Sequence, residues 1–118
     1  MQRIRLIHWK AAEAEERAGW LRAADYEVVY ETLNPTSLRE LSENPPTAVV
    51  IDLGRLPMQG RDVGLLLRQR KGTRNVPLVF VGGKPDKVAR VKESLSKAVY
   101  ADWDGIGGTL KAALRIHR

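Results

Sequence analysis

A single acid at the end of an apolar segment constrains the fold of this chain more than any other feature. Residues 48–53 read Ala-Val-Val-Ile-Asp-Leu, and a loop that contains Pro57 and Gly60 separates them from an apolar helix pattern. A short apolar run of this kind is typical of a buried strand in a parallel sheet. Since open α/β folds keep their functional sites at the carboxyl edge of the sheet, we predict that Asp52 lies at that edge.

Strand and helix patterns alternate along the whole chain in the same way. Short apolar segments with many β-branched residues predict strands at 4–7, 26–30, 48–53, 76–81 and 98–101. Apolar residues at helical spacing follow each strand, and we expect Ser37 and Glu40 to form a capping box that opens the second helix. The expected apolar stripes are Ala14, Ala18 and Leu21; Leu38 and Leu41; Val63, Leu66 and Leu67; Val88, Val91 and Leu95; and Ile106, Leu110, Ala113 and Leu114.

Five β-α units predict an α/β fold, in which a doubly wound parallel sheet is covered by helices on both faces. Right-handed crossovers favour the strand order 2-1-3-4-5, with the first and last helices on one face. The length of 118 residues suits a single domain that spans residues 1–118.

Composition removes several classes of site. The chain has no cysteine, which excludes disulfides, thiol catalysis and cysteine zinc sites. His8 and His117 are the two histidines and lie far apart in sequence, so we expect no metal site and no cofactor. No apolar stretch approaches the roughly 20 residues of a membrane helix, and the chain begins with a strand pattern in place of a signal peptide. We therefore expect a cytoplasmic protein without membrane contact.

The positive charge of the chain is concentrated in its second half. The formal net charge is +6, and residues 1–50 hold 6 basic and 8 acidic side chains whereas residues 51–118 hold 14 and 6. A basic half suits nucleic acid or another acidic partner, but these cations alternate with apolar helix positions and lack exposed aromatic neighbours. Solvated helix faces are the simpler interpretation, and nucleic-acid or anion binding stays open as an alternative.

Residues 49–60, Val-Val-Ile-Asp-Leu-Gly-Arg-Leu-Pro-Met-Gln-Gly, resemble the receiver domains of response regulators in bacterial two-component signalling. In that family an apolar strand ends in the phosphoacceptor Asp, and a Met/Leu-Pro loop and a Gly follow. The order and spacing of the five β-α units agree, although Pro57 lies one place later than usual. The resemblance implies a three-layer, flavodoxin-like receiver fold in which Asp52 is the equivalent of the phosphoacceptor.

The metal-binding acids of such a site are missing. Receivers carry a pair of acids after the first strand to hold Mg²⁺, and His8 and Trp9 fall at these positions, with Lys10 next. Mg²⁺ takes oxygen ligands in strict geometry, so neither ring replaces a carboxylate, and the Lys10 ammonium opposes the metal charge. We therefore expect His8 and Trp9 to form the wall of a filled pocket.

The phosphate-binding side chains of the family are missing as well. The Ser or Thr after the fourth strand corresponds to Gly82, which Gly83 follows, and the Lys that ends the fifth strand corresponds to Ala101 or Asp102. A glycine has no hydroxyl to donate, and an aspartate has the wrong charge for a phosphate. Phosphoryl transfer depends on positioning and charge neutralisation, so Asp52 alone is insufficient for it.

These departures predict a non-enzymatic pseudo-receiver, which binds a protein partner without Mg²⁺-dependent phosphorylation. Asp52 is then a retained acid that accepts hydrogen bonds from loop amides or pairs with Lys10. A divergent receiver that is still phosphorylated at Asp52 is the first alternative. A basic module that binds nucleic acid or an anion is the second. We expect a monomer or a weak homodimer.

Two further groups of residues are candidates for binding. The first group consists of cations that we expect at the carboxyl edge of the sheet: Lys10, Arg55, Arg61, Lys84 and Lys87. We take Asp52 and Asp102 as the main acids there, and the amides of Gly82 and Gly83 could add hydrogen-bond donors. These residues predict weak anion binding. Tyr100 and Trp103, on or beside the last strand, predict a partner surface with Lys87, Arg90, Lys92, Lys97 and Lys111. Alternatively, Tyr100 caps the core and Trp103 fills the space under the last helix.

Overall fold

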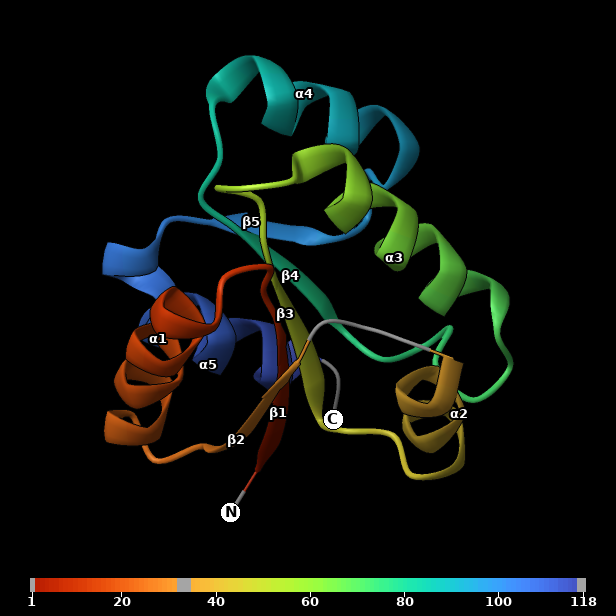
Figure 1. The fold of residues 1–118 in the computed structure, drawn as a ribbon, viewed down its shortest axis with the longest axis horizontal. Helices are drawn as coiled ribbons and strands as arrows, with labels where there is room; N and C mark the ends of the chain where they lie inside the picture. Colours follow the sequence, from red (N-terminus) through yellow and green to blue (C-terminus); the bar gives the residue numbers. More distant parts are fainter. Residues whose placement is uncertain (1, 32–34, 117–118) are drawn as a thin grey trace.

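A computed structural model describes residues 2–31 and 35–116 of the chain (Figure 1). Its five strands are β1 (Arg3–Ile7), β2 (Glu27–Glu31), β3 (Ala48–Asp52), β4 (Leu78–Val81) and β5 (Val99–Ala101). Its helices are α1 (Ala11–Ala23), α2 (Pro35–Glu43), α3 (Pro57–Gln69), α4 (Pro85–Ser94), the short 3-10 turn η1 (Trp103–Gly105) and α5 (Ile106–Ile116). Within the described ranges, no helix has both the length and the apolar character needed to cross a membrane.

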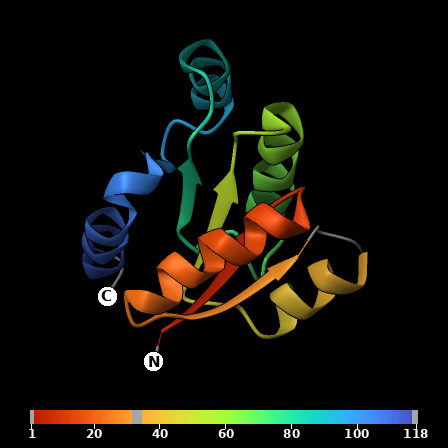
Figure 2. The same ribbon diagram turned by 60° about the vertical axis from the view of Figure 1, so that its left-hand side comes forward.

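The strands form one parallel sheet in the order β2-β1-β3-β4-β5, which confirms the predicted topology. Ile4 in β1 lies opposite Val28 in β2 and Ala48 in β3, while Asp52 at the end of β3 lies opposite Val81 at the end of β4. Helices α1 and α5 cover one face of the sheet, and α2, α3 and α4 cover the other (Figures 1 and 2). The predicted pairing of the first and last helices is therefore confirmed.

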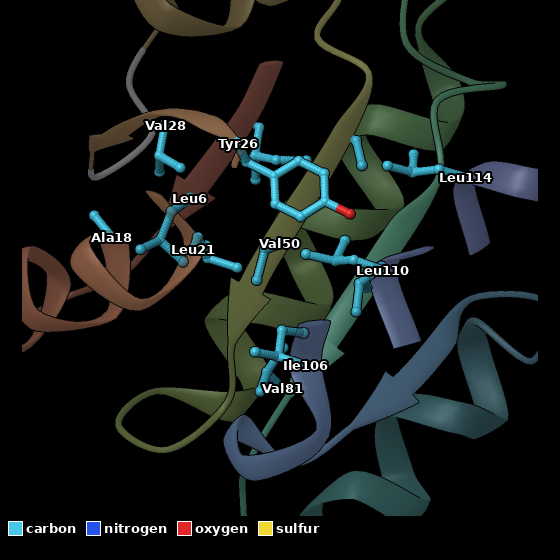
Figure 3. Close-up of a cluster of buried hydrophobic side chains, with 13 residues drawn as sticks. Leu6, Ala18, Leu21, Tyr26, Val28, Val50, Val81, Ile106, Leu110 and Leu114 are labelled. Carbon is cyan, nitrogen blue, oxygen red and sulfur yellow. The ribbon is translucent and has the colours of Figure 1, made fainter. Parts of the chain in front are cut away.

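The core on the α1 and α5 face joins apolar side chains from β1, β3 and β4 to the inner stripes of the two helices (Figure 3). Ala18 and Leu21 come from α1, and Ile106, Leu110 and Leu114 come from α5, as the helical spacing predicts. Because every residue of β3 is buried, this strand reads as a continuous apolar run. The last residue of that buried strand is Asp52.

The core on the opposite face shows where the apolar pattern misleads. The fully buried positions of α3 are Gly60, Gly64 and Leu67, whereas Leu66, predicted to be in the core, is 39% exposed. A Cβ at Gly64 would lie 2.8 Å from both Leu95 Cδ1 and Phe80 Cζ, so the helix packs on its glycine side. Because glycine has no side chain, it is not counted in an apolar stripe. The buried face predicted for α3 from its apolar residues therefore differs from the buried face in the structure.

Two predicted boundaries also need correction. The fourth strand starts at Leu78 and not at residue 76, because Pro77 has no N–H to donate to the sheet. Helix α2 already includes Ser37, so this residue lies in the first turn and does not cap the helix as we expected. Glu40 instead accepts a hydrogen bond from Arg5 at 3.1 Å. His117, one of the two histidines, lies outside the described residues.

Arg5 is a buried cation in the middle of β1. Its guanidinium pairs with Glu31 at the end of β2 and with Glu40 on α2. The arginine therefore ties the edge strand and the second helix to the sheet. At the outer side of the same edge strand, Arg22 of α1 donates to the carbonyl of Val28 at 3.0 Å, and Val29 is 52% exposed.

Candidate functional site

The site is built around Asp52, which lies where the sequence predicts, at the carboxyl edge of the sheet. Asp52 is the last residue of β3 and is only 4% exposed. The backbone continues the sheet for one more bond, because Leu53 N–H donates to the Val81 carbonyl at 2.9 Å. The chain is therefore fixed on both sides of the acid, and the carboxylate is held inside the edge rather than presented to solvent.

Both carboxylate oxygens of Asp52 accept a hydrogen bond. Gly54 N–H donates to Oδ1 at 2.7 Å, and the indole Nε1–H of Trp103 donates to Oδ2 at 2.7 Å. The His8 ring approaches the same oxygen, with Nε2 at 3.5 Å from Oδ2. Hydrogen bonds to a carboxylate are shorter and stronger than those between neutral groups, so these donors stabilise the acid where it lies.

His8 has a defined orientation in this arrangement. Its ring is buried, and the backbone N–H of Lys10 donates to Nδ1 at 3.1 Å. A neutral imidazole that accepts at Nδ1 carries its proton on Nε2, and this atom faces Asp52 Oδ2. Glu13 Oε1 lies 4.0 Å from the same nitrogen. The residue at one metal-ligand position of receivers is thus a nitrogen donor aimed at the acid.

Trp9 turns the other way. Its half-buried ring packs against the core on the α3 side, and a Cβ at Gly60 would lie 3.8 Å from it. The two residues expected to form one pocket wall therefore diverge. His8 faces the carboxylate, and Trp9 closes the gap between the first loop and α3.

Trp103 fills the space under the last helix, one of the two roles considered for it, but its hydrogen bond to Asp52 was not predicted. It is the first residue of η1, just beyond β5, and its ring packs beside the core under α5. It meets the Trp20 ring in an edge-to-face arrangement at a centroid distance of 6.0 Å, and the Arg17 guanidinium lies over both rings, at 4.5 Å from Trp20 and 5.5 Å from Trp103. The sequence did contain one signal for this contact. An indole can only donate a hydrogen bond, and Trp103 follows β5, a strand that ends at the same edge as Asp52.

Lys10 does not pair with Asp52, so one of the two expected partners of that acid is wrong. The Lys10 ammonium lies 3.6 Å from Glu13 Oε2 and its side chain is half exposed. Arg55 binds the same Glu13 carboxylate through two nitrogens. This hydrogen bond lowers the pKa of Glu13 below its usual value and raises the pKa of Arg55. Of the expected partners of Asp52, only the loop amide is present.

Acids other than Asp52 and Asp102 pair with three cations of the predicted anion site. Glu13 pairs with both Lys10 and Arg55 and offsets one of their two charges, and Arg61 pairs with its neighbour Asp62 at 3.2 Å. The expectation that Asp52 and Asp102 are the main acids at this edge is therefore wrong. The Gly82 amide is not available either, because it donates to the Ala101 carbonyl at 3.0 Å.

Gly82 and Gly83 have a conformational role between β4 and α4. Their φ angles are +76° and +90°, in the left-handed region that glycine adopts readily. A Cβ at Gly83 would lie 2.9 Å from Leu53 Cβ, so this turn also packs closely on the Asp52 loop. Lys84 and Lys87 follow at the start of α4.

Comparison with known proteins adds structural neighbours only. No family model matches the chain, and no curated protein matches it. A sensor protein from Polaromonas sp. JS666 matches with a TM-score of 0.81 and 18% identity, over 99% of this chain and 98% of that chain. A response regulator receiver domain protein from Clostridium thermocellum matches with a TM-score of 0.78 and 16% identity, over 98% and 96%. The chain has the receiver-domain fold.

A third receiver-fold neighbour was solved with magnesium. The receiver domain of a sensor histidine kinase from Pseudomonas aeruginosa, with a magnesium ion coordinated in its active-site cleft, matches with a TM-score of 0.76 and 17% identity, over 97% of this chain and 98% of that chain. The residues around Asp52 in the present chain do not fit such an ion. His8 and Trp103 direct nitrogen donors at Oδ2, and Mg²⁺ takes oxygen ligands. Among residues 2–31 and 35–116, no group of three or more acids, histidines or cysteines is placed to hold a metal.

The residues expected at the partner surface occupy different environments. Tyr100 stacks on Phe80 with ring centroids 5.3 Å apart, its hydroxyl donates to the Leu95 carbonyl at 2.9 Å, and burial raises its pKa to about 12. It therefore caps the core, the second of the two roles considered for it. The Lys92 ammonium lies 5.0 Å from the Tyr100 ring. Arg90 and Lys111 are exposed.

A hollow of about 370 Å³ lies between α4 and β5. Lys92, Tyr100 and the exposed Asp102 are among its lining residues. Asp102, one of the two candidates for the position of the receiver lysine, thus borders this hollow. The donor that does reach Asp52 from beyond β5 is the neutral indole one residue later.

Proposed function

We propose that this chain is a receiver-fold signalling module that acts by binding a protein partner and forms no magnesium-dependent aspartyl phosphate. The observation that carries the proposal is the state of the Asp52 carboxylate. It is buried, and each of its oxygens accepts a hydrogen bond of 2.7 Å. The receiver fold supports the signalling role, and the chemistry of the site supports the absence of phosphorylation.

Attack by Asp52 on a phosphoryl donor needs a carboxylate oxygen in line with the phosphorus atom. The Gly54 amide holds Oδ1, and Trp103 together with the His8 ring covers Oδ2. Release of either hydrogen bond to the buried carboxylate costs about 1.5–3 kcal/mol before any reaction starts. Asp52 is therefore a poor nucleophile in this position.

The transferred group would also find little counter-charge near Asp52. Phosphoryl transfer is promoted mainly by metal ions and cations that neutralise the developing negative charge. Lys10 and Arg55, the cations from the two neighbouring loops, are bound to Glu13. Trp103 donates one neutral hydrogen bond and carries no charge.

The proposed partner surface comprises α4, β5 and the outer side of α5. Lys92, Tyr100 and Asp102 line the 370 Å³ hollow there, exposed Arg90 adds positive charge on α4, and Lys111 is exposed on α5. An aromatic and apolar hollow bordered by Lys92 and Asp102 suits a protein segment that carries apolar side chains and an acidic group for the Lys92 ammonium. Nucleic acid is less favoured, because three cations of the Asp52 edge are already paired with Glu13 and Asp62.

Incubation with Mg²⁺ and acetyl phosphate, followed by intact-mass measurement, tests the phosphorylation part. We expect no change in mass for the wild-type chain or for the matched control Asp52→Asn. A phosphoryl adduct that forms on the wild type and disappears in Asp52→Asn would establish the alternative, a divergent receiver phosphorylated at Asp52.

Charge reversal tests the partner part. We expect Arg90→Glu with Lys111→Glu to abolish capture of a partner from the native cell extract, while Arg39→Glu, an exposed change on α2, leaves capture intact. Equal capture by all three proteins would remove α4, β5 and α5 as the binding surface. Binding to duplex DNA that weakens steeply with salt would support the nucleic-acid alternative instead.

A further inference from the structure

We infer that Trp103 is a latch, which couples the buried Asp52 carboxylate to an aromatic cluster at the surface of α1. A ligand that displaces Arg17 or Trp20 then also weakens the hydrogen bond from Trp103 to Asp52. In the other direction, a change at Asp52 alters the environment of Arg17 and Trp20. This inference goes beyond the proposed function, because the coupling is a property of the free chain and needs neither a phosphate nor the α4 surface.

The two ends of the Trp103 side chain have different partners. The indole nitrogen donates to Asp52 Oδ2 at 2.7 Å. The ring itself meets the Trp20 ring at an interplanar angle of 68° and a centroid distance of 6.0 Å, and the Arg17 guanidinium lies 5.5 Å from its centre. One rigid bicyclic side chain thus contacts the interior acid and the surface cluster together, so it cannot shift at one end without shifting at the other.

The surface end of this arrangement is accessible to a ligand. Trp20 is 46% exposed, and Arg17 lies 4.5 Å from the centre of its ring. Arg17 also pairs with its neighbour Glu16, whose side chain is more than half exposed. Trp20 and Arg17 belong to α1 and contact Trp103, so the cluster adjoins the site without donating a hydrogen bond to Asp52.

The segment that carries Trp103 has room to move. Trp103 begins the three-residue turn η1, which ends at Gly105. A Cβ at Gly105, Gly107 or Gly108 would meet no atom within 4 Å, so the start of α5 is not tightly packed beside the turn. The position of Trp103 therefore depends on its side-chain contacts, which are the Asp52 hydrogen bond, the core beside α5, and the Arg17 guanidinium and Trp20 ring at the surface.

Coupling of this kind is reciprocal, since two sites that bias one shared element influence each other by the same free energy. Disruption of the surface cluster must weaken the Asp52 hydrogen bond. Loss of the Asp52 acceptor must in turn change the environment of the Trp20 ring. Each direction gives an independent measurement.

NMR of the three tryptophan indole N–H groups tests both directions on the full chain. We expect solvent exchange of the Trp103 indole proton to become about tenfold faster in the double variant Arg17→Ala with Trp20→Ala, because an aromatic pair and a cation–π contact are lost. The matched control is Arg22→Ala, an exposed arginine of the same helix that contacts Glu15 and the Val28 carbonyl. We expect that variant to exchange like the wild type.

The reverse measurement uses Asp52→Ala, with Asp52→Asn as the second variant if the alanine variant does not fold. We expect the Trp20 indole resonance to shift, although no atom of Trp20 changes. Unchanged Trp103 exchange in the double variant, or an unchanged Trp20 resonance in both Asp52 variants, overturns the latch. Neither result bears on the phosphoryl-transfer assay, so failure of the latch and failure of the proposed function are separable.

Discussion

The change Trp103→Phe isolates the contribution of one hydrogen bond to the stability of the site. Phenylalanine keeps an aromatic ring beside α5 but removes the Nε1–H that donates to Asp52 Oδ2. The acceptor is a carboxylate that is only 4% exposed, so water does not replace the lost donor freely. Hydrogen bonds to charged groups contribute about 1.5–3 kcal/mol, and the smaller ring also loses contact with Trp20. We expect a loss of about 2–4 kcal/mol in the free energy of unfolding.

Urea unfolding at pH 7 measures this loss, with Trp9→Phe as the matched control. Trp9 is half-buried and makes no hydrogen bond with the described residues, so its replacement should cost about 1 kcal/mol or less. A double-mutant cycle with Asp52→Asn then separates the hydrogen bond from the ring contacts, and we expect a coupling energy above about 1 kcal/mol. Equal destabilisation by the two tryptophan changes, with no coupling to Asp52, would refute the assignment of Trp103 as the partner of the acid.

Three further changes test other parts of the structure. Arg5→Met should lower the free energy of unfolding by about 2 kcal/mol, because it leaves the partly buried Glu31 carboxylate at the end of β2 unpaired. Glu40→Gln changes an exposed carboxylate and should cost under about 0.5 kcal/mol in the same urea experiment. Tyr100 has a folded-state pKa of about 12 against an ordinary value of 10.0, so its contribution to stability is complete below pH 10 and is lost as the pH rises toward 12. Ultraviolet titration should show a late-ionising tyrosine that Tyr100→Phe removes, and ionisation near 10 would contradict the burial. Gly64→Ala should destabilise by about 1–3 kcal/mol, since its Cβ would lie 2.8 Å from Leu95 Cδ1, and a stabilised variant would show that α3 packs on another side.

The fold was predictable because its signals are local. Continuous apolar runs such as the one in β3 mark buried parallel strands, and the crossover rule then restricts the strand order. The exposed Leu66 shows the limit of this reasoning. Close packing through Gly64 depends on the space beside α3, and a residue without a side chain leaves no mark in an apolar pattern.

The site was less predictable because its contacts cross the chain. Trp103 lies 51 positions after Asp52 in the sequence, and no spacing rule connects an indole to a carboxylate over that distance. Lys10 follows a local rule instead, since it pairs with Glu13 three residues along the chain. The sequence alone shows that the metal-binding acids, the hydroxyl and the lysine of the receiver pattern are missing. Only the structure shows that the Trp103 indole binds Asp52 in their place.

Arg22 has a consequence for the behaviour of the protein at high concentration. An edge strand with an exposed valine is a template onto which a strand of another molecule can add, and natural sheets block such growth with charge. The Arg22 guanidinium lies on the Val28 carbonyl and places a cation next to Val29, so it discourages strand addition at β2. This arginine on a neighbouring helix thus places a charge against edge-to-edge aggregation at β2, a role distinct from packing the core.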